Sequence, residues 1–363
     1  MDKRMHDSTK LLWHMDRVIS HFDKGERVAP IHIDMGIAKF CNVACVFCYG
    51  KYQDVQKVFI EKDPLLQTMW DAKDIGVKSI AFIGDGEPTC NPYLYDALEL
   101  AKNIDLDMAI STNGFLVNDE EKCHKILSSC KWMRFCISAG TRDGYKAVHG
   151  RDYFDKVVEN IKRIVRVKMK YEYDCEIGMQ SVFVPTTMRE EMVLESRLAV
   201  DLGVDYFVIK QCSIPDDGES GIGNFDLKEY DSPETQQALM MCERLSTNKT
   251  DIIVKWNIMH QKGVRPYTGC KSVPFISEIS GNGDWYPCGF MFGDKPEFKD
   301  CKFGNVHESS LKTIFESQHY WDVISKMRDN FDVHKQCRGS CRLDSTNKFC
   351  YDYLNKPRGI NFI

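Results

Sequence analysis

The stretch SIAFIGDGEP, residues 79–88, passes from an apolar run into a polar, glycine-rich turn. Its first half has the short and continuous apolar character of a buried strand. Residues 31–37 alternate apolar and other residues with period two and are also interpreted as a strand. Four further apolar runs are interpreted in the same way, at residues 108–112, 133–138, 176–184 and 206–212. The sequence therefore predicts six strands spaced along its first 212 residues.

Amphipathic segments separate these runs and are typical of helices. They cover residues 65–76, 94–104, 121–130, 154–167 and 190–203. Gly76 and Gly203 end two of them and are suited to helix C-caps. This alternation predicts a parallel sheet covered by helices. Six β/α units are too few for an eightfold barrel, so we expect an α/β fold built on a partial (β/α)6 TIM-like barrel.

In such barrels, catalytic residues collect at the C-terminal ends of the strands. Unusual residues do follow the predicted strands. A cysteine loop comes after the first strand, GDGEP (84–88) after the second, STNG (111–114) after the third, SAGT (138–141) after the fourth and QCS (211–213) after the sixth. We therefore expect the functional site at this end of the barrel.

Composition limits the class of protein. The 363 residues are 43% apolar and 28% charged, as in an ordinary soluble globular protein, and the net charge of −5 favours neither a nucleic-acid nor a membrane partner. The N-terminus lacks the apolar core of a signal peptide, and no stretch approaches the roughly 20 uncharged apolar residues of a membrane span. We expect a cytoplasmic protein, in which sixteen cysteines indicate metal or catalytic sites.

Three of these cysteines share one short loop, Cys41-x3-Cys45-x2-Cys48. Soft thiolates select zinc, copper(I) or iron–sulfur clusters. A structural zinc site normally takes four ligands, and Cys90, the next cysteine in the sequence, is isolated. Three thiols on one loop suit a [4Fe–4S] cluster whose fourth iron stays open to a ligand outside the protein. A zinc knuckle is the alternative.

The same residues resemble the radical S-adenosylmethionine (SAM) superfamily. CNVACVFC (41–48) is similar to its CxxxCxΦC signature, and GDGEP is similar to its GGEP motif, with Asp85 in place of the first glycine. The resemblance covers roughly residues 30–225. It implies a [4Fe–4S] cluster, SAM as cofactor, reductive cleavage of SAM to a 5′-deoxyadenosyl radical, and an electron donor of the flavodoxin or ferredoxin type.

The resemblance also implies which residues contact SAM. Gly86, Glu87 and Pro88 would bind its amino group, and Asn113 and Ser138 its carboxylate or ribose. The backbone from Phe47 to Tyr49 would contact the adenine, and Gln180 in the fifth strand is a further candidate. For each polar residue, a structural turn or cap is the alternative.

Cysteines return near the C-terminus, where Cys270, Cys288, Cys337 and Cys341 are joined by a GDWYPC hairpin and a GN…SL…I segment. This pattern resembles the SPASM domain or its shortened twitch form over about residues 260–350. It implies one auxiliary [4Fe–4S] cluster held by these four cysteines. Cys301 and Cys350 are then spare, although Cys350 is able to replace one of the close pair. A structural zinc ion is the alternative.

The chain is accordingly divided into four parts. Residues 1–29 are an N-terminal helical extension, residues 30–225 the radical SAM partial barrel, residues 226–259 a linker with a helix, and residues 260–363 a small cysteine-rich SPASM/twitch-like domain.

An auxiliary cluster favours oxidation, because a substrate radical that becomes a carbonyl must pass on an electron. Relatives that modify peptides commonly carry an N-terminal recognition domain, and the 40 residues before Cys41 are too few for one. We therefore expect a hydroxylated small molecule as substrate, such as a sugar, cyclitol or nucleotide sugar. A peptide substrate stays open, as does a non-catalytic protein that holds zinc or relays electrons.

Two residues at the end of the sixth strand are catalytic candidates. Cys212 is either inert or a hydrogen-atom donor, which would make the protein an epimerase instead of a dehydrogenase. Lys210 shares its face by strand alternation. It either pairs with a substrate carboxylate or phosphate, acts as a base if burial lowers its pKa, or is an ordinary exposed lysine. His149 either approaches the SAM site or serves a structural turn.

Overall fold

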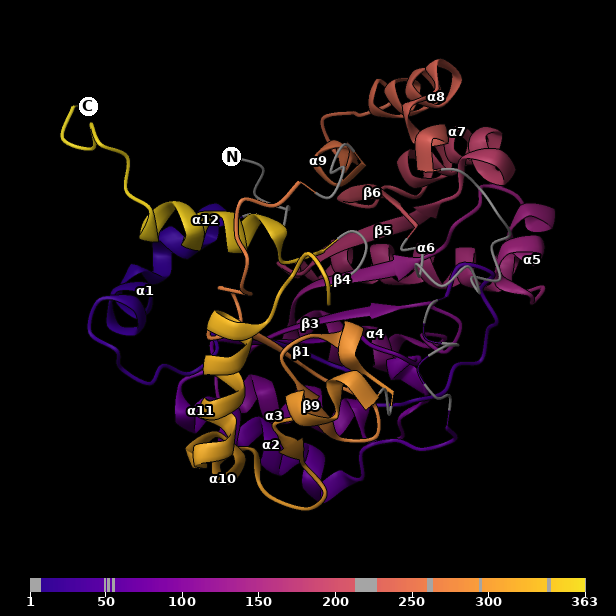
Figure 1. The fold of residues 1–363 in the computed structure, drawn as a ribbon. Helices are drawn as coiled ribbons and strands as arrows, with labels where there is room; N and C mark the ends of the chain where they lie inside the picture. Colours follow the sequence, from indigo (N-terminus) through magenta and orange to yellow (C-terminus); the bar gives the residue numbers. More distant parts are fainter. Residues whose placement is uncertain are drawn as a thin grey trace.

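A single sheet carries the fold. The computed structural model describes residues 8–48, 50, 53, 56–212, 227–259, 264–293, 296–337 and 341–362. Within them, ten strands lie in the order β10-β9-β8-β1-β2-β3-β4-β5-β6-β7. The strands from β8 to β7 in this order are parallel to their neighbours, and β9 and β10 pair antiparallel. Figure 1 shows the sheet in the middle of the molecule with helices packed outside it.

Six strands correspond to the six apolar runs of the sequence. They are β1 (His32–Met35), β2 (Ser79–Phe82), β3 (Asp107–Thr112), β4 (Cys130–Cys136), β5 (Glu176–Phe183) and β6 (Tyr206–Gln211). They are parallel neighbours in chain order. The α/β fold class with a partial barrel is therefore confirmed.

Helices connect these strands and bury their outward side chains. They are α2 (Lys62–Ile75), α3 (Leu94–Asn103), α4 (Glu120–Ser129), α5 (Arg142–His149), α6 (Phe154–Tyr171) and α7 (Pro185–Leu202). Gly76 and Gly203 cap α2 and α7 with positive φ angles of 102° and 68°, as predicted. The sequence does not predict α5, because it has only eight residues and contains Gly144, a poor helix former.

The segment 226–259 is not the linker that the sequence suggests, because it extends the sheet. A 3₁₀ turn (Leu227–Asp231) leads to α8 (Pro233–Glu243), β7 (Asp251–Val254) and α9 (Trp256–Met259). β7 pairs parallel with β6 from Tyr206–Asp251 to Ile209–Val254. Its four residues are too few for a periodic pattern, so only the pairing identifies it as a strand.

The C-terminal region also joins the barrel sheet. Its elements are β8 (Ile276–Ile279), β9 (Asp284–Tyr286), β10 (Gly304–Asn305), α10 (Leu311–Glu316), α11 (Gln318–Ser325) and α12 (Asp344–Leu354). β8 lies parallel beside β1, with His32 opposite Ile276. Apolar residues of both regions form one continuous core. The domain expected at residues 260–363 is thus continuous with the barrel.

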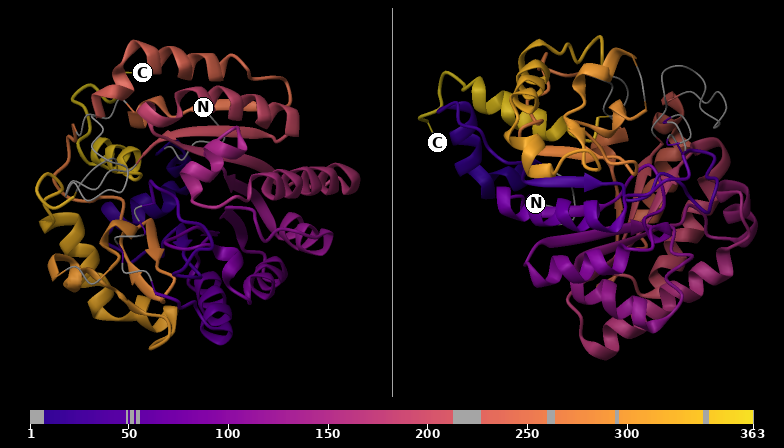
Figure 2. Two further views of the ribbon diagram at one scale, coloured as in Figure 1. Left: turned by 90° about the vertical axis from the view of Figure 1, so that its right-hand side faces the viewer. Right: turned by 90° about the horizontal axis from the view of Figure 1, so that it is seen from below.

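The N-terminal extension packs on the C-terminal helix. A 3₁₀ helix (Ser8–His14) and α1 (Met15–Phe22) lie beside α12 at the left of Figure 1, and Figure 2 shows the same neighbourhood from two other sides. Val18, Phe275 and Cys350 belong to the small apolar cluster that joins them. No helix in the described part of the chain is long and apolar enough to cross a membrane.

Asp85 ties the barrel to the C-terminal hairpin. Its carboxylate accepts a hydrogen bond from Ser280 Oγ at 2.6 Å and another from the backbone N–H of Gly281 at 3.0 Å. The side chain therefore points to the turn between β8 and β9. This contact accounts for an aspartate at the position where the GGEP motif has glycine.

Arg342 makes a second contact between the C-terminal region and the barrel. Its guanidinium pairs with Asp34 on β1 and lies 3.5 Å from Glu278 on β8. Burial alone would raise the pKa of Asp34, but Arg342 and His32 hold it well below its ordinary value. The ionised carboxylate of Asp34 is 3% exposed, so its stability depends on these partners.

Replacing Arg342 with leucine is expected to destabilise the fold by about 2–3 kcal/mol, below the range for a fully buried pair because the Arg342 side chain is 41% exposed. Because the pKa of Asp34 is depressed, this loss is present at neutral pH and fades as pH falls below roughly 4. Denaturant unfolding at pH 7 measures it. Arg142→Leu, which breaks the exposed pair with Asp152, is the control and should lower the free energy of unfolding far less, because solvent screens this pair. Equal losses would contradict the prediction.

Candidate functional site

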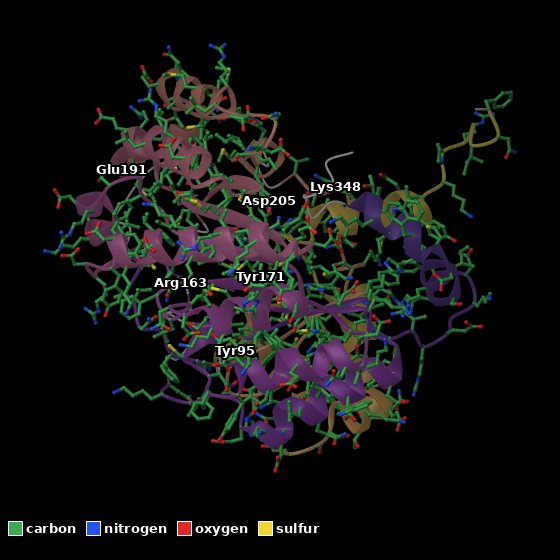
Figure 3. The ribbon with its side chains drawn as sticks, turned by 180° about the vertical axis from the view of Figure 1, so that it is seen from behind. Tyr95, Arg163, Tyr171, Glu191, Asp205 and Lys348 are labelled. Carbon is green, nitrogen blue, oxygen red and sulfur yellow. The ribbon has the colours of Figure 1, made fainter. Side chains whose placement is uncertain are left out.

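The segments singled out in the sequence meet at the C-terminal ends of the strands. The cysteine loop follows β1, residues 84–88 follow β2, Asn113 follows β3 and Ser138 follows β4. Figure 3 labels a residue near each end of the barrel. Asp205 directly precedes β6, whereas Glu191 on α7 accepts hydrogen bonds from the backbone of Gly140 and Thr141 in the loop after β4. The site lies at the end marked by Glu191.

The cysteine loop is held by the end of α5. The backbone N–H groups of Ala44 and Val46 each donate at 2.9 Å, to the carbonyl oxygens of His149 and Val148. The ring nitrogen Nδ1 of His149 lies 3.0 Å from Cys45 Sγ. These contacts place the end of α5 along the loop that carries the three cysteines.

Asn113 holds the other side of the loop. Its Nδ2 donates to Asn42 Oδ1 at 2.6 Å and contacts Cys41 Sγ at 3.8 Å. The pKa of the Cys41 thiol is raised to about 12. Desolvation is the largest cause, the negative charge of Glu87 is the next, and Cys48 and Cys90 contribute less. Cys90, isolated in the sequence, therefore lies near the loop in the fold.

The turn after β2 packs tightly against the chain that enters the cysteine loop. A Cβ on Gly86 would lie 2.2 Å from the carbonyl oxygen of Ala38, so only glycine fits there. The N–H of Glu87 donates to the carbonyl of Phe40 at 2.9 Å, and the buried Pro88 begins a 3₁₀ turn. These contacts fix the turn at the edge of the site.

The carboxylate of Glu87 is fully engaged by protein groups. Oε1 accepts from the backbone N–H of Thr89 at 3.0 Å and from the hydroxyls of Thr89 and Thr112 at 2.6 and 2.5 Å, and Oε2 accepts from the N–H of Asn113 at 2.8 Å. Burial raises its pKa, and these bonds oppose the shift. The side chain joins the ends of β2 and β3. In the backbone of the same turn, the N–H of Glu87 donates to Phe40, and the carbonyl oxygens of Glu87 and Pro88 accept from the N–H groups of Cys90 and Asn91.

The other predicted cofactor residues lie at the same end, and their roles stay predictions. Ser138 Oγ accepts from the N–H of Val182 at 3.1 Å, and Gln180 Nε2 contacts Cys136 Sγ at 3.8 Å. Phe47 is partly buried, with its ring 6.1 Å from that of His149. Tyr49 lies outside the described residues.

Inside the barrel, two cations face the same space. By strand alternation Trp132, Arg134 and Cys136 share one face of β4, opposite to the fully buried Met133 and Phe135. Lys210 and Cys212 occupy the corresponding face of β6. Arg134 is 9% exposed and lies 5.1 Å from the Trp132 ring centre, and its Nε has no hydrogen-bond partner. In the described part of the chain, Arg134 and Lys210 pair with no carboxylate.

Arg134 influences Lys210 directly. Desolvation first, and the neighbouring guanidinium of Arg134 next, lower the pKa of Lys210 to about 8. Cys212 is 1% exposed, and desolvation raises its pKa to about 12. Sequence reasoning missed Arg134, although a charged residue within the apolar run MRFCIS was the available signal.

The four C-terminal cysteines surround one pocket. Cys270, Cys288, Cys337 and Cys341 line it together with Arg265, Asn347 and apolar side chains. Asn347 Nδ2 donates to Cys270 Sγ at 3.6 Å, while its Oδ1 accepts from the N–H of Ser272 at 2.9 Å. Four thiols around one apolar pocket fit an iron–sulfur cluster. Cys301 and Cys350 are outside the lining, and Cys350 is buried in the N-terminal cluster.

Among the described residues, no three Cys, His, Asp or Glu side chains form a group suited to a single ion. In a [4Fe–4S] cluster each cysteine binds a different iron, so the sulfurs need not converge on a point. Three thiols on one loop and four around a pocket are compatible with that arrangement.

Two family models match the chain. The Radical SAM superfamily model matches residues 35–193, and the model of the iron–sulfur cluster-binding domain SPASM matches residues 270–342. The first match contains the cysteine loop, the turn after β2 and strands β3 to β5. The second contains the four cysteines around the C-terminal pocket.

Two curated relatives match the barrel. A probable GTP 3′,8-cyclase of Saccharolobus solfataricus is 28% identical over 194 residues, 53% of this chain and 58% of that protein. An S-adenosylmethionine-dependent nucleotide dehydratase of Flammeovirga pacifica is 23% identical over 190 residues, 49% of this chain and 60% of that protein. The chain spans less than two thirds of the length of these relatives.

Solved structures share the fold. Streptococcus suis SuiB bound to S-adenosylmethionine superposes with a TM-score of 0.64 at 16% identity, covering 87% of this chain and 73% of SuiB. Native anSMEcpe with bound AdoMet gives a TM-score of 0.58 at 16% identity, covering 92% of this chain and all of that one. In both cases the similarity covers more of this chain than the barrel alone.

Proposed function

This chain belongs to the radical SAM superfamily and carries a C-terminal SPASM iron–sulfur domain, and we propose that it oxidises an alcohol on a hydroxylated small molecule that bears an anionic group. The family implies a [4Fe–4S] cluster, SAM and an additional iron–sulfur cluster. We assign the first cluster to Cys41, Cys45 and Cys48, and SAM to the strand ends around Gly86 and Ser138.

When bound, the first cluster and SAM supply the 5′-deoxyadenosyl radical that removes a hydrogen atom, and the auxiliary cluster accepts the electron that the substrate then loses. Cys270, Cys288, Cys337 and Cys341 would hold the auxiliary cluster. The apolar lining of their pocket would keep water away from it.

The environment of Arg134 is the observation that supports an anionic substrate. A guanidinium that is nine-tenths buried, with no carboxylate partner in the described residues, is costly unless a ligand compensates its charge. Its planar donors suit a phosphate or carboxylate. We therefore assign Arg134 to the anionic group of the substrate.

Lys210 is assigned the role of base. Conversion of an alcohol carbon to a carbonyl releases a hydrogen atom, a proton and an electron, and the proton needs an acceptor close to the hydroxyl. With a pKa of about 8, a useful fraction of the Lys210 amine is neutral near physiological pH. Its Nζ would take the hydroxyl proton while Arg134 keeps the substrate in place.

The curated relatives support an anionic substrate, since one is named for GTP and the other for nucleotides. Each match covers about half of this chain, so the agreement bears on the barrel alone. A nucleotide or nucleotide sugar combines a hydroxylated ring with phosphate groups. This class satisfies both Arg134 and the expected alcohol chemistry.

Epimerisation is the second candidate. Cys212 is buried at the end of β6, and its raised pKa of about 12 keeps the sulfur protonated, as a hydrogen-atom donor requires. An epimerase would leave one solvent hydrogen on carbon in its product, whereas an oxidase would give a carbonyl. Product analysis in deuterium oxide separates the two.

The test is substrate-triggered formation of 5′-deoxyadenosine by the anaerobically reconstituted protein with SAM and dithionite. Nucleotide sugars and sugar phosphates should trigger it, and the same compounds without phosphate should not. Arg134→Gln should raise KM for the active compound about tenfold to hundredfold with a smaller change in kcat, because a charge-assisted hydrogen bond is lost. Arg134→Lys, which keeps the charge, should lose less. Equal turnover of the phosphate-free compounds would reject the anionic substrate class.

A further inference from the structure

His149 stands 104 residues from Cys45 in sequence, yet their side chains meet beneath the cysteine loop. The imidazole is 1% exposed. Its ring centre lies 4.3 Å from that of Tyr145, with the two rings tilted, and the Phe47 ring packs against it edge to face. Its carbonyl oxygen accepts from the N–H of Ala44. Ring and backbone are therefore both fixed relative to the loop.

The hydrogen bonds of His149 define its tautomer. The backbone N–H of Ser138 donates to Nε2 at 3.0 Å, and a backbone N–H has no other role than donor. Nε2 must therefore present its lone pair, so the ring proton resides on Nδ1. Nδ1 is the atom 3.0 Å from Cys45 Sγ, and the imidazole donates an N–H···S hydrogen bond to that sulfur.

We propose that His149 is a positioning residue for the first cluster, whose Nδ1–H donates to the Cys45 thiolate and raises the reduction potential of the cluster. The inference rests on the assignment of Cys45 as a ligand and goes beyond the proposed substrate chemistry. Hydrogen bonds to ligand sulfurs stabilise the more negatively charged reduced form, and they are among the features that set iron–sulfur potentials. The ring also connects Ser138, at the end of β4, to Cys45 in the cysteine loop.

Two substitutions separate the two hydrogen bonds. In His149→Asn, the amide nitrogen Nδ2 occupies the branch position of Nδ1 and keeps a donor for Cys45. In His149→Gln, the amide lies one bond farther out, where its oxygen accepts from Ser138 and the donor to Cys45 is lost. Comparison of the two variants therefore tests the hydrogen bond to Cys45 separately from the hydrogen bond with the backbone of Ser138.

The measurement is an anaerobic redox titration of the complete reconstituted protein, followed by EPR. The signal of the first cluster is the one that changes when SAM is added, which distinguishes it from the auxiliary signal. His149→Gln should shift its midpoint to lower potential by at least a tenfold change in the reduction equilibrium, about 59 mV for one electron. His149→Asn should remain near the wild-type value.

Wild-type protein labelled with ¹⁵N at histidine Nδ1 provides a measurement that does not depend on a variant's folding. Pulsed EPR of the reduced cluster should detect a coupled ¹⁵N nucleus and an exchangeable proton. Absence of both couplings, or an unchanged midpoint in His149→Gln with its iron content retained, overturns the proposal. These measurements use no substrate, so failure of the proposed oxidation leaves their result unaffected.

Discussion

Replacing Cys41, Cys45 and Cys48 together with alanine is expected to remove the first cluster and reduce SAM cleavage to background. The three thiols lie on one loop that is held by α5 on one side and by Asn113 on the other. Without them the folded barrel retains no soft donors on that loop. Iron content should fall to the share of the auxiliary cluster, and dithionite with SAM should yield no 5′-deoxyadenosine.

Cys90→Ala is the matched control. Cys90 lies near Cys41 in the fold, so its removal tests whether the protein itself supplies a ligand to the fourth iron. We expect this variant to retain iron and SAM cleavage, because the fourth iron must remain open for SAM. Loss of the cluster in Cys90→Ala would mean that Cys90 is a ligand of the fourth iron. SAM could then not bind that iron, and the proposed radical mechanism would be wrong.

The second large effect is expected at Lys210. Burial and Arg134 lower its pKa to about 8, so the neutral, proton-accepting form grows as pH rises through that value. The rate of substrate oxidation at saturating substrate should therefore rise between about pH 7 and 9 in the wild-type protein. Lys210→Arg keeps a cation but cannot accept a proton at these pH values, and it should lower the rate by about 10²–10⁴-fold.

Steady-state rates across this pH range, with 5′-deoxyadenosine and the carbonyl product measured together, provide the check. Lys131→Arg makes the same exchange at an exposed site on β4 and should leave the profile unchanged. A Lys210→Arg variant that retains the wild-type rate, and whose rate still rises between about pH 7 and 9, would show that Lys210 is not the base. Loss of binding without loss of rate would instead indicate an anion-binding role.

Local patterns were sufficient for the barrel strands and for the cysteine motifs. Each of the six runs lies within a few residues of its strand, because continuous apolar strands and amphipathic helices differ in short-range periodicity. The helix caps at Gly76 and Gly203 likewise depend only on neighbouring residues. The short strands β7 and β8 escaped this reasoning, since four residues carry too little pattern and their pairing partners lie far along the chain.

The candidate site divides in the same way. Spacing alone identified the three loop cysteines, because a motif within eight residues is a local property of the chain. Nothing local shows that Asp85 turns toward Ser280, that Arg134 has no carboxylate partner among the described residues, or that His149 Nδ1 lies 3.0 Å from Cys45 Sγ. Those relations depend on strand order and register, which bring residues separated by up to about two hundred positions into contact.

The amino-acid sequence by itself thus determined the family chemistry, namely soft thiols, a glycine-rich turn and a β/α rhythm. The tertiary structure alone decided which charged side chains of the described residues lack an opposite charge inside the barrel, and which ring nitrogen of His149 lies beside Cys45. The physical reason is that hydrogen bonds and ion pairs form over a few ångströms of space, and only the assembled sheet specifies those distances.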